Sequence, residues 1–141
     1  TCDVLSGPWA CGEVMRINAT GPMLVTREAL PLLRRGTAPL ILNVSSQLGS
    51  MQVAATKGRD TSYCMSKAAL NMWSVKAAVT LEPEGIAVVM LHPGWVSTDM
   101  GGPSAQLTPG ESAAAIVDTV ARLGLDDTGR FMTWDGADHP W

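Results

Sequence analysis

Apolar residues recur at helical intervals in two long stretches of the chain. Residues 8–33 show this spacing up to Arg34-Arg35-Gly36, and residues 61–82 show it up to Pro83-Glu84-Gly85. Side chains three and four positions apart share one helix face, so each stretch is predicted to bury one face against a core. A third helix is predicted from Thr108-Pro109-Gly110-Glu111, a capping-box pattern that satisfies the first turn. Its inward side chains are expected to be Ala115, Ile116, Val120 and Leu123.

Three shorter apolar runs alternate with these helices. Residues 39–44, 86–92 and 129–134 are bounded by Pro, Gly or polar residues, which is typical of strands buried on both faces. Alternating helices and strands imply right-handed crossovers and a mainly parallel sheet, so the predicted fold class is α/β. Residues 47–60 and 93–107 are predicted to be loops, and the polar, glycine-containing first loop suggests function or mobility more than scaffold.

Composition indicates a globule and an intracellular setting. Of the 141 residues, 46% are hydrophobic and the formal net charge is −3, which permits a core and gives no basis for binding nucleic acid or an anionic membrane. No apolar run approaches ~18 residues and no signal peptide is evident, so we expect a soluble, cytoplasmic protein. Cys2, Cys11 and Cys64 lack metal-type spacing, and we expect reduced structural cysteines and no metal site.

The single tyrosine begins the segment Tyr63-Cys64-Met65-Ser66-Lys67. Four residues are about one helical turn, so the Tyr63 phenol and the Lys67 ammonium are predicted to project from the same face. A phenol with a pKa near ~10 is a poor acid or base at neutral pH, but a nearby cation favours phenolate and lowers that pKa. Such a phenol passes a proton to or from a carbonyl or alcohol oxygen. The alternative is a Tyr and a Lys on a solvated helix face.

Three further segments surround Tyr63 in a recognisable order. Asn18 lies in a helical pattern, Asn43-Val44-Ser45-Ser46 closes a strand, and Pro93-Gly94 follows the next strand. With the Tyr63 segment, this ordered set resembles the short-chain dehydrogenase/reductase family, and residues 92–102 resemble its C-factor-like carbonyl reductase branch. The resemblance covers nearly the whole chain. It implies the second half of a Rossmann-like, doubly wound fold: a mainly parallel sheet of three strands with three main helices.

The amino-terminal half of that fold has no counterpart in the sequence. Family members run to roughly 250 residues as one domain, whereas this chain has 141. No glycine-rich turn that would cradle a cofactor pyrophosphate follows an apolar strand, and the residue that reads the ribose 2′ position is missing with it. We therefore expect residues 1–141 to be the carboxyl-terminal catalytic and substrate half of a reductase domain, lacking the dinucleotide-binding strands. It would be either a fragment or the product of a truncated gene.

The resemblance implies catalytic roles for four residues. Tyr63 would be the acid/base, and Lys67 would lower its pKa and bind the nicotinamide ribose hydroxyls. Ser46 would hydrogen-bond the substrate carbonyl, with Ser45 as the competing candidate and a plain turn residue as the alternative. Asn18 would sit at a helix kink and hold a water that links Lys67 to solvent, unless it is a surface Asn. The 17 positions from Ser46 to Tyr63 exceed the common family spacing, so the intervening loop is expected to shape the substrate site.

The resemblance also implies a cofactor site. Pro93-Gly94 would turn the chain beneath the nicotinamide, and the backbone of Val96 and the hydroxyl of Thr98 would hold its carboxamide. A simple turn and a cap are the alternatives. Trp95 either lines the substrate mouth or covers the strand edge. The cofactor is NADP or NAD, with NADP favoured by the branch, and the cofactor-binding set is completed by Tyr63 and Lys67.

Three kinds of function remain open. The favoured one is a nicotinamide-dependent oxidoreductase acting on a small-molecule carbonyl or secondary alcohol, with Tyr63 as acid/base. The second is a truncated, non-catalytic remnant or binding module. The third is a hydrolase using Ser46, His92 and an acid such as Asp99, ranked last because no Gly-x-Ser-x-Gly elbow exists and His92 is expected to be structural.

The oligomeric state also stays open. The family often pairs subunits through two helices that match residues 8–33 and 61–82, whereas the C-factor-like branch includes monomers.

Overall fold

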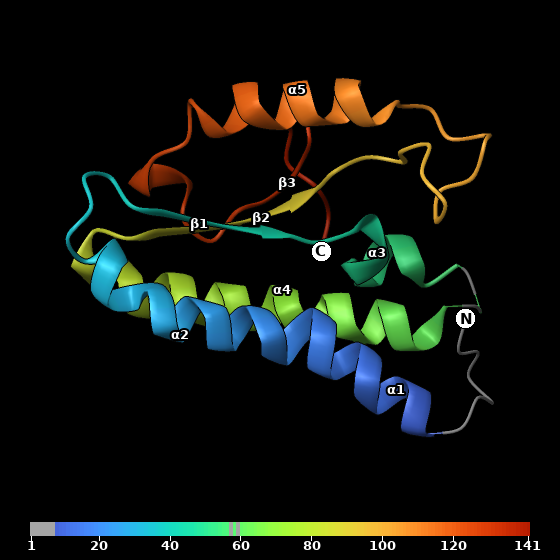
Figure 1. Cartoon of the computed structure of the whole chain (residues 1–141), viewed down its shortest axis with the longest axis horizontal. Coiled ribbons are helices and arrows are strands. Elements are labelled where there is room, and N and C mark those ends of the chain that lie inside the picture. The colour runs from blue at the N-terminus through green and yellow to red at the C-terminus, as the bar shows by residue number, and fades with distance from the viewer. Residues whose placement is uncertain (1–7, 57, 59) are drawn as a thin grey trace.

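A three-stranded parallel β-sheet forms the middle layer of the described chain, which comprises residues 8–56, 58 and 60–141 of this computed structural model. The strands are β1 (Leu40–Val44), β2 (Ala87–His92) and β3 (Phe131–Thr133), in that order across the sheet. The helix α5 (Pro109–Val120) lies over one face, and two long helical segments cover the other (Figure 1). The predicted α/β fold class and the parallel sheet are therefore confirmed.

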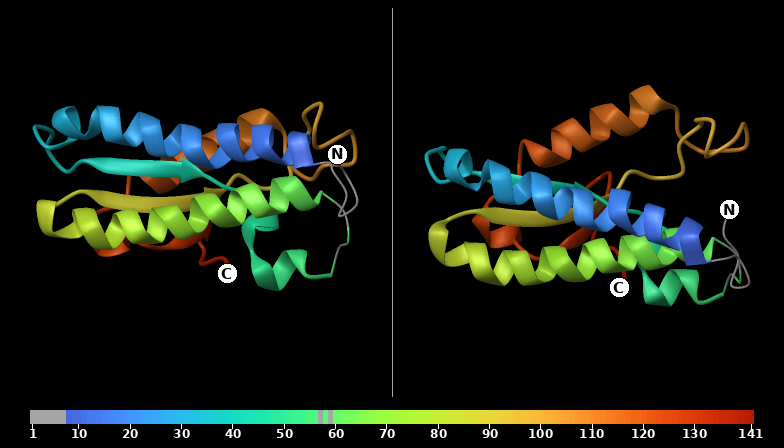
Figure 2. Two further views of the ribbon diagram at one scale, coloured as in Figure 1. Left: turned by 90° about the horizontal axis from the view of Figure 1, so that it is seen from below. Right: turned by 60° about the horizontal axis from the view of Figure 1, so that its bottom comes forward.

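The two long helical segments run side by side beneath the sheet (Figure 2). The first comprises α1 (Pro8–Met15), the π-helical turn η1 (Arg16–Thr20) and α2 (Gly21–Leu33), and the second is α4 (Thr61–Leu81). π-Helical turns interrupt the regular hydrogen-bond ladder of a helix and recur at functional positions. Asn18, where a helix kink is predicted, lies within η1, so the hydrogen-bond ladder is irregular at this residue. Among the described helices, none is both long and apolar enough to cross a bilayer.

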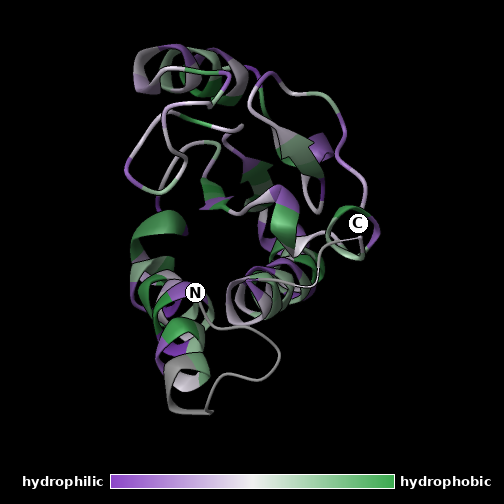
Figure 3. Cartoon of the chain, turned by 90° about the vertical axis from the view of Figure 1, so that its right-hand side faces the viewer, coloured by the Kyte–Doolittle hydropathy of each residue, from purple (hydrophilic) through white to green (hydrophobic). Residues whose placement is uncertain are grey.

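The core is centred on β2, all of whose residues are buried. Val88 packs on Leu81 of α4, whereas Val89 and Leu91 pack on Met132 of β3 toward the opposite face. In Figure 3 the apolar strands lie between the helical layers. The unbroken apolar run that predicted β2 therefore reflects burial on both faces of the sheet.

Ile116 of α5 and Leu123 just after it pack against the core as predicted, but the most buried side chains of the helix are two hydroxyls. Thr108 caps it as predicted, since its hydroxyl accepts from the Glu111 N–H at 3.2 Å and its own N–H donates to the Glu111 carboxylate at 2.8 Å. The buried side chains are Ser112 and Thr119, which donate to the carbonyl oxygens of Pro93 and Trp134. These hydrogen bonds turn the hydroxyl-bearing face inward. The predicted inward residues are only partly buried: Ala115, Ile116, Val120 and Leu123.

The segment predicted as a loop after β1 contains two short helices. These are the 3-10 turn η2 (Gln47–Gly49) and the helix α3 (Met51–Ala54). Each begins at a serine cap, because Ser46 Oγ accepts from the Leu48 N–H and Ser50 Oγ accepts from the Val53 N–H. Two further 3-10 turns, η3 (Glu82–Glu84) and η4 (Leu125–Asp127), complete the described elements.

Polar side chains fill much of the contact between α4 and β1. The buried Ser74 hydroxyl accepts from Asn43 Nδ2 at 2.8 Å and donates to the Leu70 carbonyl at 2.7 Å. Nearer the end of β1, the Ser45 hydroxyl donates to Asn71 Oδ1 at 2.6 Å. Because hydrogen bonds are directional, the Ser45–Asn71 contact fixes the position of α4 at the end of β1 more tightly than apolar packing would.

Replacing Ser74 with alanine should lower the free energy of unfolding by about 1–3 kcal/mol, because the buried Asn43 amide loses its partner. Thr80→Ala is the matched control, since this exposed hydroxyl of the same helix donates only to the Lys76 carbonyl. Urea denaturation of both variants measures the difference. Similar losses of unfolding free energy in the two variants would show that the buried Asn43–Ser74 bond stabilises the protein no more than an exposed one does.

Candidate active site

The carboxyl ends of β1 and β2 meet at one edge of the sheet. Val44 pairs with Leu91, and the Ser45 N–H donates to the Leu91 carbonyl at 2.7 Å. This register brings the segment that begins at Ser46 beside the segment that begins at Pro93. Open α/β sheets bind their ligands at this edge, so the two segments form one side of a candidate site.

Helix α4 brings Tyr63 and Lys67 to the same edge. Lys67 Nζ lies 5.7 Å from the centre of the Tyr63 ring, so the predicted placement on one helix face is confirmed. The same Nζ donates to the Val44 carbonyl at 2.9 Å, which anchors the ammonium at the end of β1. An ammonium has three donors. Within the described residues, Lys67 uses one of them.

Burial controls the electrostatics of this pair. It raises the pKa of the Tyr63 phenol, a hydrogen bond with Ser46 lowers that pKa to a smaller extent, and nearby Cys64 raises it. Burial likewise lowers the pKa of Lys67. The prediction that Lys67 depresses the pKa of Tyr63 is wrong for this structure. Its ammonium is held at the Val44 carbonyl and over the ring, and loss of solvent is the larger effect.

The structure separates the two candidate serines. The Ser46 side chain lies close enough to Tyr63 to lower the pKa of the phenol, and its oxygen accepts from the Leu48 N–H at 3.1 Å. The Ser45 hydroxyl points instead to Asn71. Only Ser46 is therefore placed to act together with Tyr63. Its hydrogen bond to a substrate carbonyl stays a prediction.

Asn18 is connected to the start of α4 through Ser66. Asn18 Nδ2 donates to Ser66 Oγ at 3.1 Å, and Ser66 Oγ donates to the Tyr63 carbonyl at 2.8 Å. This contact ties the π-helical turn to the helical turn that carries the phenol. The water-mediated link from Asn18 to Lys67 stays a prediction.

The turn after β2 needs glycine at position 94. Gly94 has a φ of +88°, and a Cβ there would lie 2.5 Å from Leu107 Cδ1 and 3.0 Å from the Trp134 ring. A side chain would therefore be both strained and crowded. The preceding Pro93 carbonyl accepts from Ser112 at 2.7 Å, so α5 holds this turn in place.

Val96 and Thr98 differ in their readiness to bind a ligand. The Val96 N–H has no acceptor among the described residues, so it can donate to a carboxamide. The Thr98 hydroxyl donates to the Val96 carbonyl at 3.5 Å and accepts from the Gly101 N–H at 3.2 Å. The Trp95 indole is likewise used within this loop, where its Nε1 donates to the Gly101 carbonyl at 2.8 Å. Thr98 would have to exchange loop contacts in order to hold a carboxamide.

His92 has the surroundings of a structural residue. It is 6% exposed, and its ring meets Trp134 edge-on at 6.0 Å and His139 at 5.6 Å. Burial, with a smaller contribution from His139, lowers the pKa of His92 to about 4. Within the described chain no hydrogen bond joins Ser46, His92 and Asp99, so the structure gives the hydrolase alternative no support.

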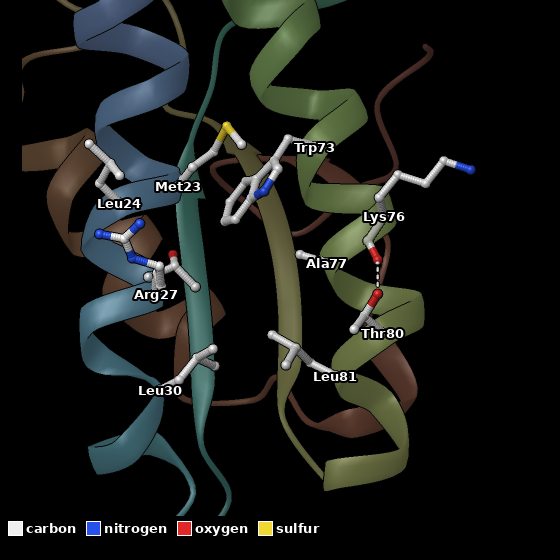
Figure 4. Close-up of a pocket in the computed structure, with 10 residues that line it drawn as sticks. Met23, Leu24, Arg27, Leu30, Trp73, Lys76, Ala77, Thr80 and Leu81 are labelled. Carbon is white, nitrogen blue, oxygen red and sulfur yellow. Dashed lines mark hydrogen bonds between the residues drawn. The ribbon is translucent and has the colours of Figure 1, made fainter.

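A cavity of about 390 Å³ lies apart from these residues, between α2 and α4. Figure 4 shows Met23, Leu30 and Trp73 around it, and none of the predicted catalytic residues lines it. A second cavity, of about 200 Å³, lies between residues 48–54 and the first turns of α4, beside the site. Cys64 lines this second cavity, and neither Cys64 nor Cys11 forms a disulfide, whereas Cys2 lies outside the described residues.

Comparison with known proteins decides the family. Residues 9–107 match the family model for short chain dehydrogenases. The chain belongs to this family. It is 42% identical to C-signal of Myxococcus xanthus over 146 aligned positions, covering 97% of this chain and 87% of that protein. It is 34% identical to the 1-hydroxy-2-glutathionyl-2-methyl-3-butene dehydrogenase of Rhodococcus sp., covering 90% of this chain and 57% of the enzyme.

Several of the similar solved structures are carbonyl reductases. The Drosophila melanogaster carbonyl reductase Sniffer has a TM-score of 0.84 at 38% identity, with 90% of this chain and 55% of that chain covered. The NADPH-bound carbonyl reductase from chicken fatty liver has a TM-score of 0.89 at 33% identity, with 98% and 60% covered. The chain thus spans little more than half the length of these reductases.

Two residues of the site escaped the sequence analysis. Ser66 connects Asn18 to the Tyr63 turn, and Asn71 receives the Ser45 hydroxyl. A helical count from Tyr63 and Lys67 places Asn71 one turn further on the same face. This spacing could have pointed to Asn71, but it could not reveal that Asn71 bonds the buried Ser45 hydroxyl.

Ser46→Ala should raise the pKa of Tyr63 further, because the variant removes a hydrogen bond that opposes the effect of burial. The phenol is the only tyrosine of this chain, so the ultraviolet absorbance of phenolate reports it directly. Ser97→Ala serves as a control in the loop across the site and should leave the midpoint unchanged. A midpoint that stays constant or falls in Ser46→Ala would contradict the contact.

Proposed function

We propose that this chain supplies the proton-transfer and substrate-binding half of a nicotinamide-dependent carbonyl reductase or alcohol dehydrogenase. The supporting observation is that Lys67 Nζ lies 5.7 Å from the centre of the Tyr63 ring, at the carboxyl edge of the sheet, with Ser46 close enough to lower the pKa of the phenol. The family membership and the carbonyl reductase neighbours support the same reaction class. The substrate would be a small molecule with a carbonyl or secondary alcohol group.

In the reductive direction, Tyr63 donates its phenolic proton to the developing alkoxide oxygen. Burial keeps this phenol protonated at neutral pH, so the proton is available when negative charge forms on the substrate. The Ser46 hydroxyl orients the same substrate oxygen, and Lys67 Nζ lies 5.7 Å from the centre of the phenol ring. The nicotinamide cofactor, when bound, supplies the hydride.

The residues present fit the nicotinamide end of such a cofactor. Lys67 keeps two N–H donors for ribose hydroxyls within the described chain, and the Val96 N–H faces no acceptor there. Pro93-Gly94 forms the adjoining turn. The phosphate cradle is not encoded in these residues. NADP is preferred over NAD because carbonyl reductase neighbours bind NADPH or NADP.

A second candidate is a cytoplasmic binding module without a cofactor site. The comparison with C-signal favours it, because this chain covers 87% of that relative, whereas it covers only 55% and 60% of the two carbonyl reductases described above. In length, the chain therefore resembles C-signal more than the reductases. The two candidates differ in whether the protein binds a nicotinamide cofactor.

Tyr63→Phe should lower kcat/KM for carbonyl reduction by about 10²–10⁴-fold, because it removes the proton donor. Cofactor affinity should change little, since the ring and Lys67 remain. Steady-state kinetics and cofactor fluorescence titration, done on the natural polypeptide that contains this chain, separate the two effects. Thr80→Ala, on the exposed face of the same helix, is the control with unchanged turnover.

Retained turnover in Tyr63→Phe would exclude Tyr63 as the acid. The isolated 141-residue chain should bind the cofactor weakly or not at all, and a form extended at its amino end should bind it. Tight binding by the isolated chain would show that the phosphate cradle is dispensable. No binding by either form would favour the module.

A homo-oligomer formed by the two long helices belongs to the same proposal. Both helices expose large apolar side chains seven residues apart: Val25 (70%) and Leu32 (64%) on α2, and Met72 (60%) and Val79 (69%) on α4. A second copy packed on this face would remove them from water. Light scattering should show a multiple of the chain mass for the natural protein and a lower mass for Met72→Glu/Val79→Glu. Monomeric natural protein would exclude this pairing.

A further inference from the structure

Asn71 holds the chain segment that carries Ser46 from both sides. Upstream of Ser46, the Ser45 hydroxyl donates to Asn71 Oδ1 at 2.6 Å. Downstream, Asn71 Nδ2 donates to the Gly49 carbonyl at 3.4 Å. Asn71 and Ser45 are each 2% exposed, so no solvent competes for these bonds. The amide therefore bridges the two ends of the turn that contains Ser46.

The backbone of this turn is pressed against α4 at the same place. A Cβ on Gly49 would lie 3.0 Å from Asn71 Nδ2 and 3.0 Å from Lys67 Cβ. The turn is closed by the Gly49 N–H, which donates to the Ser46 carbonyl at 2.8 Å. Gly49 thus allows a close approach, and Asn71 supplies the polar contacts that fix where along α4 the approach occurs.

The position of Asn71 on α4 explains why the contact matters for chemistry. Tyr63, Lys67 and Asn71 follow one another at intervals of four residues, so they lie along one face of the helix. One helix face therefore carries both the phenol and the group that fixes the position of Ser46. A shift of the Ser46 turn along this face would break the contact between Ser46 and Tyr63.

We propose that Asn71 is a positioning residue, which holds the Ser46 turn on α4 through Ser45 and Gly49 and thereby keeps Ser46 beside Tyr63. The importance of this role for catalysis rests on the proposed function, which assigns the chemistry to Ser46 and Tyr63. The positioning itself does not. Asn71 itself acts through Ser45 and Gly49 and need not touch substrate or cofactor.

The test is a double-mutant cycle read from the titration of Tyr63. In the natural polypeptide, the difference in phenolate absorbance between each protein and its Tyr63→Phe counterpart isolates this phenol. Asn71→Ala should move the Tyr63 midpoint to higher pH, in the same direction as Ser46→Ala. In the Ser46→Ala background, Asn71→Ala should add no further shift, because the hydrogen bond that it positions is already absent.

The control for a general loss of packing is Ser74→Ala. It breaks the buried Asn43–Ser74 bond between the same helix and strand, and it should leave the Tyr63 midpoint unchanged. Ser45→Ala removes the other side of the Asn71 contact with a smaller change in volume. It should reproduce the upward shift if Asn71→Ala fails to fold, as judged by near-ultraviolet circular dichroism.

An unchanged midpoint in the folded Asn71 or Ser45 variant would overturn the role. So would a shift that persists in full when Ser46 is already alanine, because the effect would then bypass Ser46. The titration needs neither cofactor nor turnover. If the natural protein is inactive but its variants show the predicted pattern of Tyr63 midpoints, the proposed function is excluded and the positioning role of Asn71 is supported.

Discussion

The close contact between α4 and the end of β1 is the constraint on which the site depends. One helix carries the phenol and the ammonium, and one strand leads to Ser46, so the position of α4 along β1 decides whether the three groups meet. Hydrogen bonds from Ser45 to Asn71 and from Lys67 to the Val44 carbonyl set that position. Apolar side chains alone would tolerate sliding, because their attraction has little directional preference.

The same contact removes water from Tyr63 and Lys67. Burial raises the pKa of the phenol and lowers that of the amine, so each neutral form is favoured. A phenol that keeps its proton at neutral pH is suited to donate that proton when a substrate oxygen becomes negative. The Ser46 hydrogen bond opposes the rise in the pKa, so the exact placement of Ser46 adjusts the acidity of Tyr63.

Sequence reasoning recovered the features that depend on local pattern. It placed α4 at Thr61–Leu81 and the capping box at Thr108, because caps and periodicity are encoded within a few residues. The kink expected at Asn18 came from the family resemblance, and this residue lies in a π-helical turn. Sequence reasoning did not recover the short helices after β1, which depend on serine caps within a polar segment. It also missed the direction of the Tyr63 pKa, because spacing along a helix reveals a neighbouring charge but not the loss of solvent. Ser112 and Thr119 on the inward face of α5 were missed for a similar reason: their hydroxyls bond backbone carbonyls far away in the sequence.

The exposed edge of the sheet, formed by β1 within the described chain, lies next to Lys67 of the candidate site. Within the described chain β1 is an edge strand, and Val44 at its end is 50% exposed even though its carbonyl accepts from Lys67. Leu40 and Leu42 on the α5 side are only partly buried. Further strands of the kind that the longer relatives carry would pair with this edge. They would also cover these leucines and reach the surroundings of the Lys67 ammonium. A strand paired with this edge would therefore lie next to the candidate site.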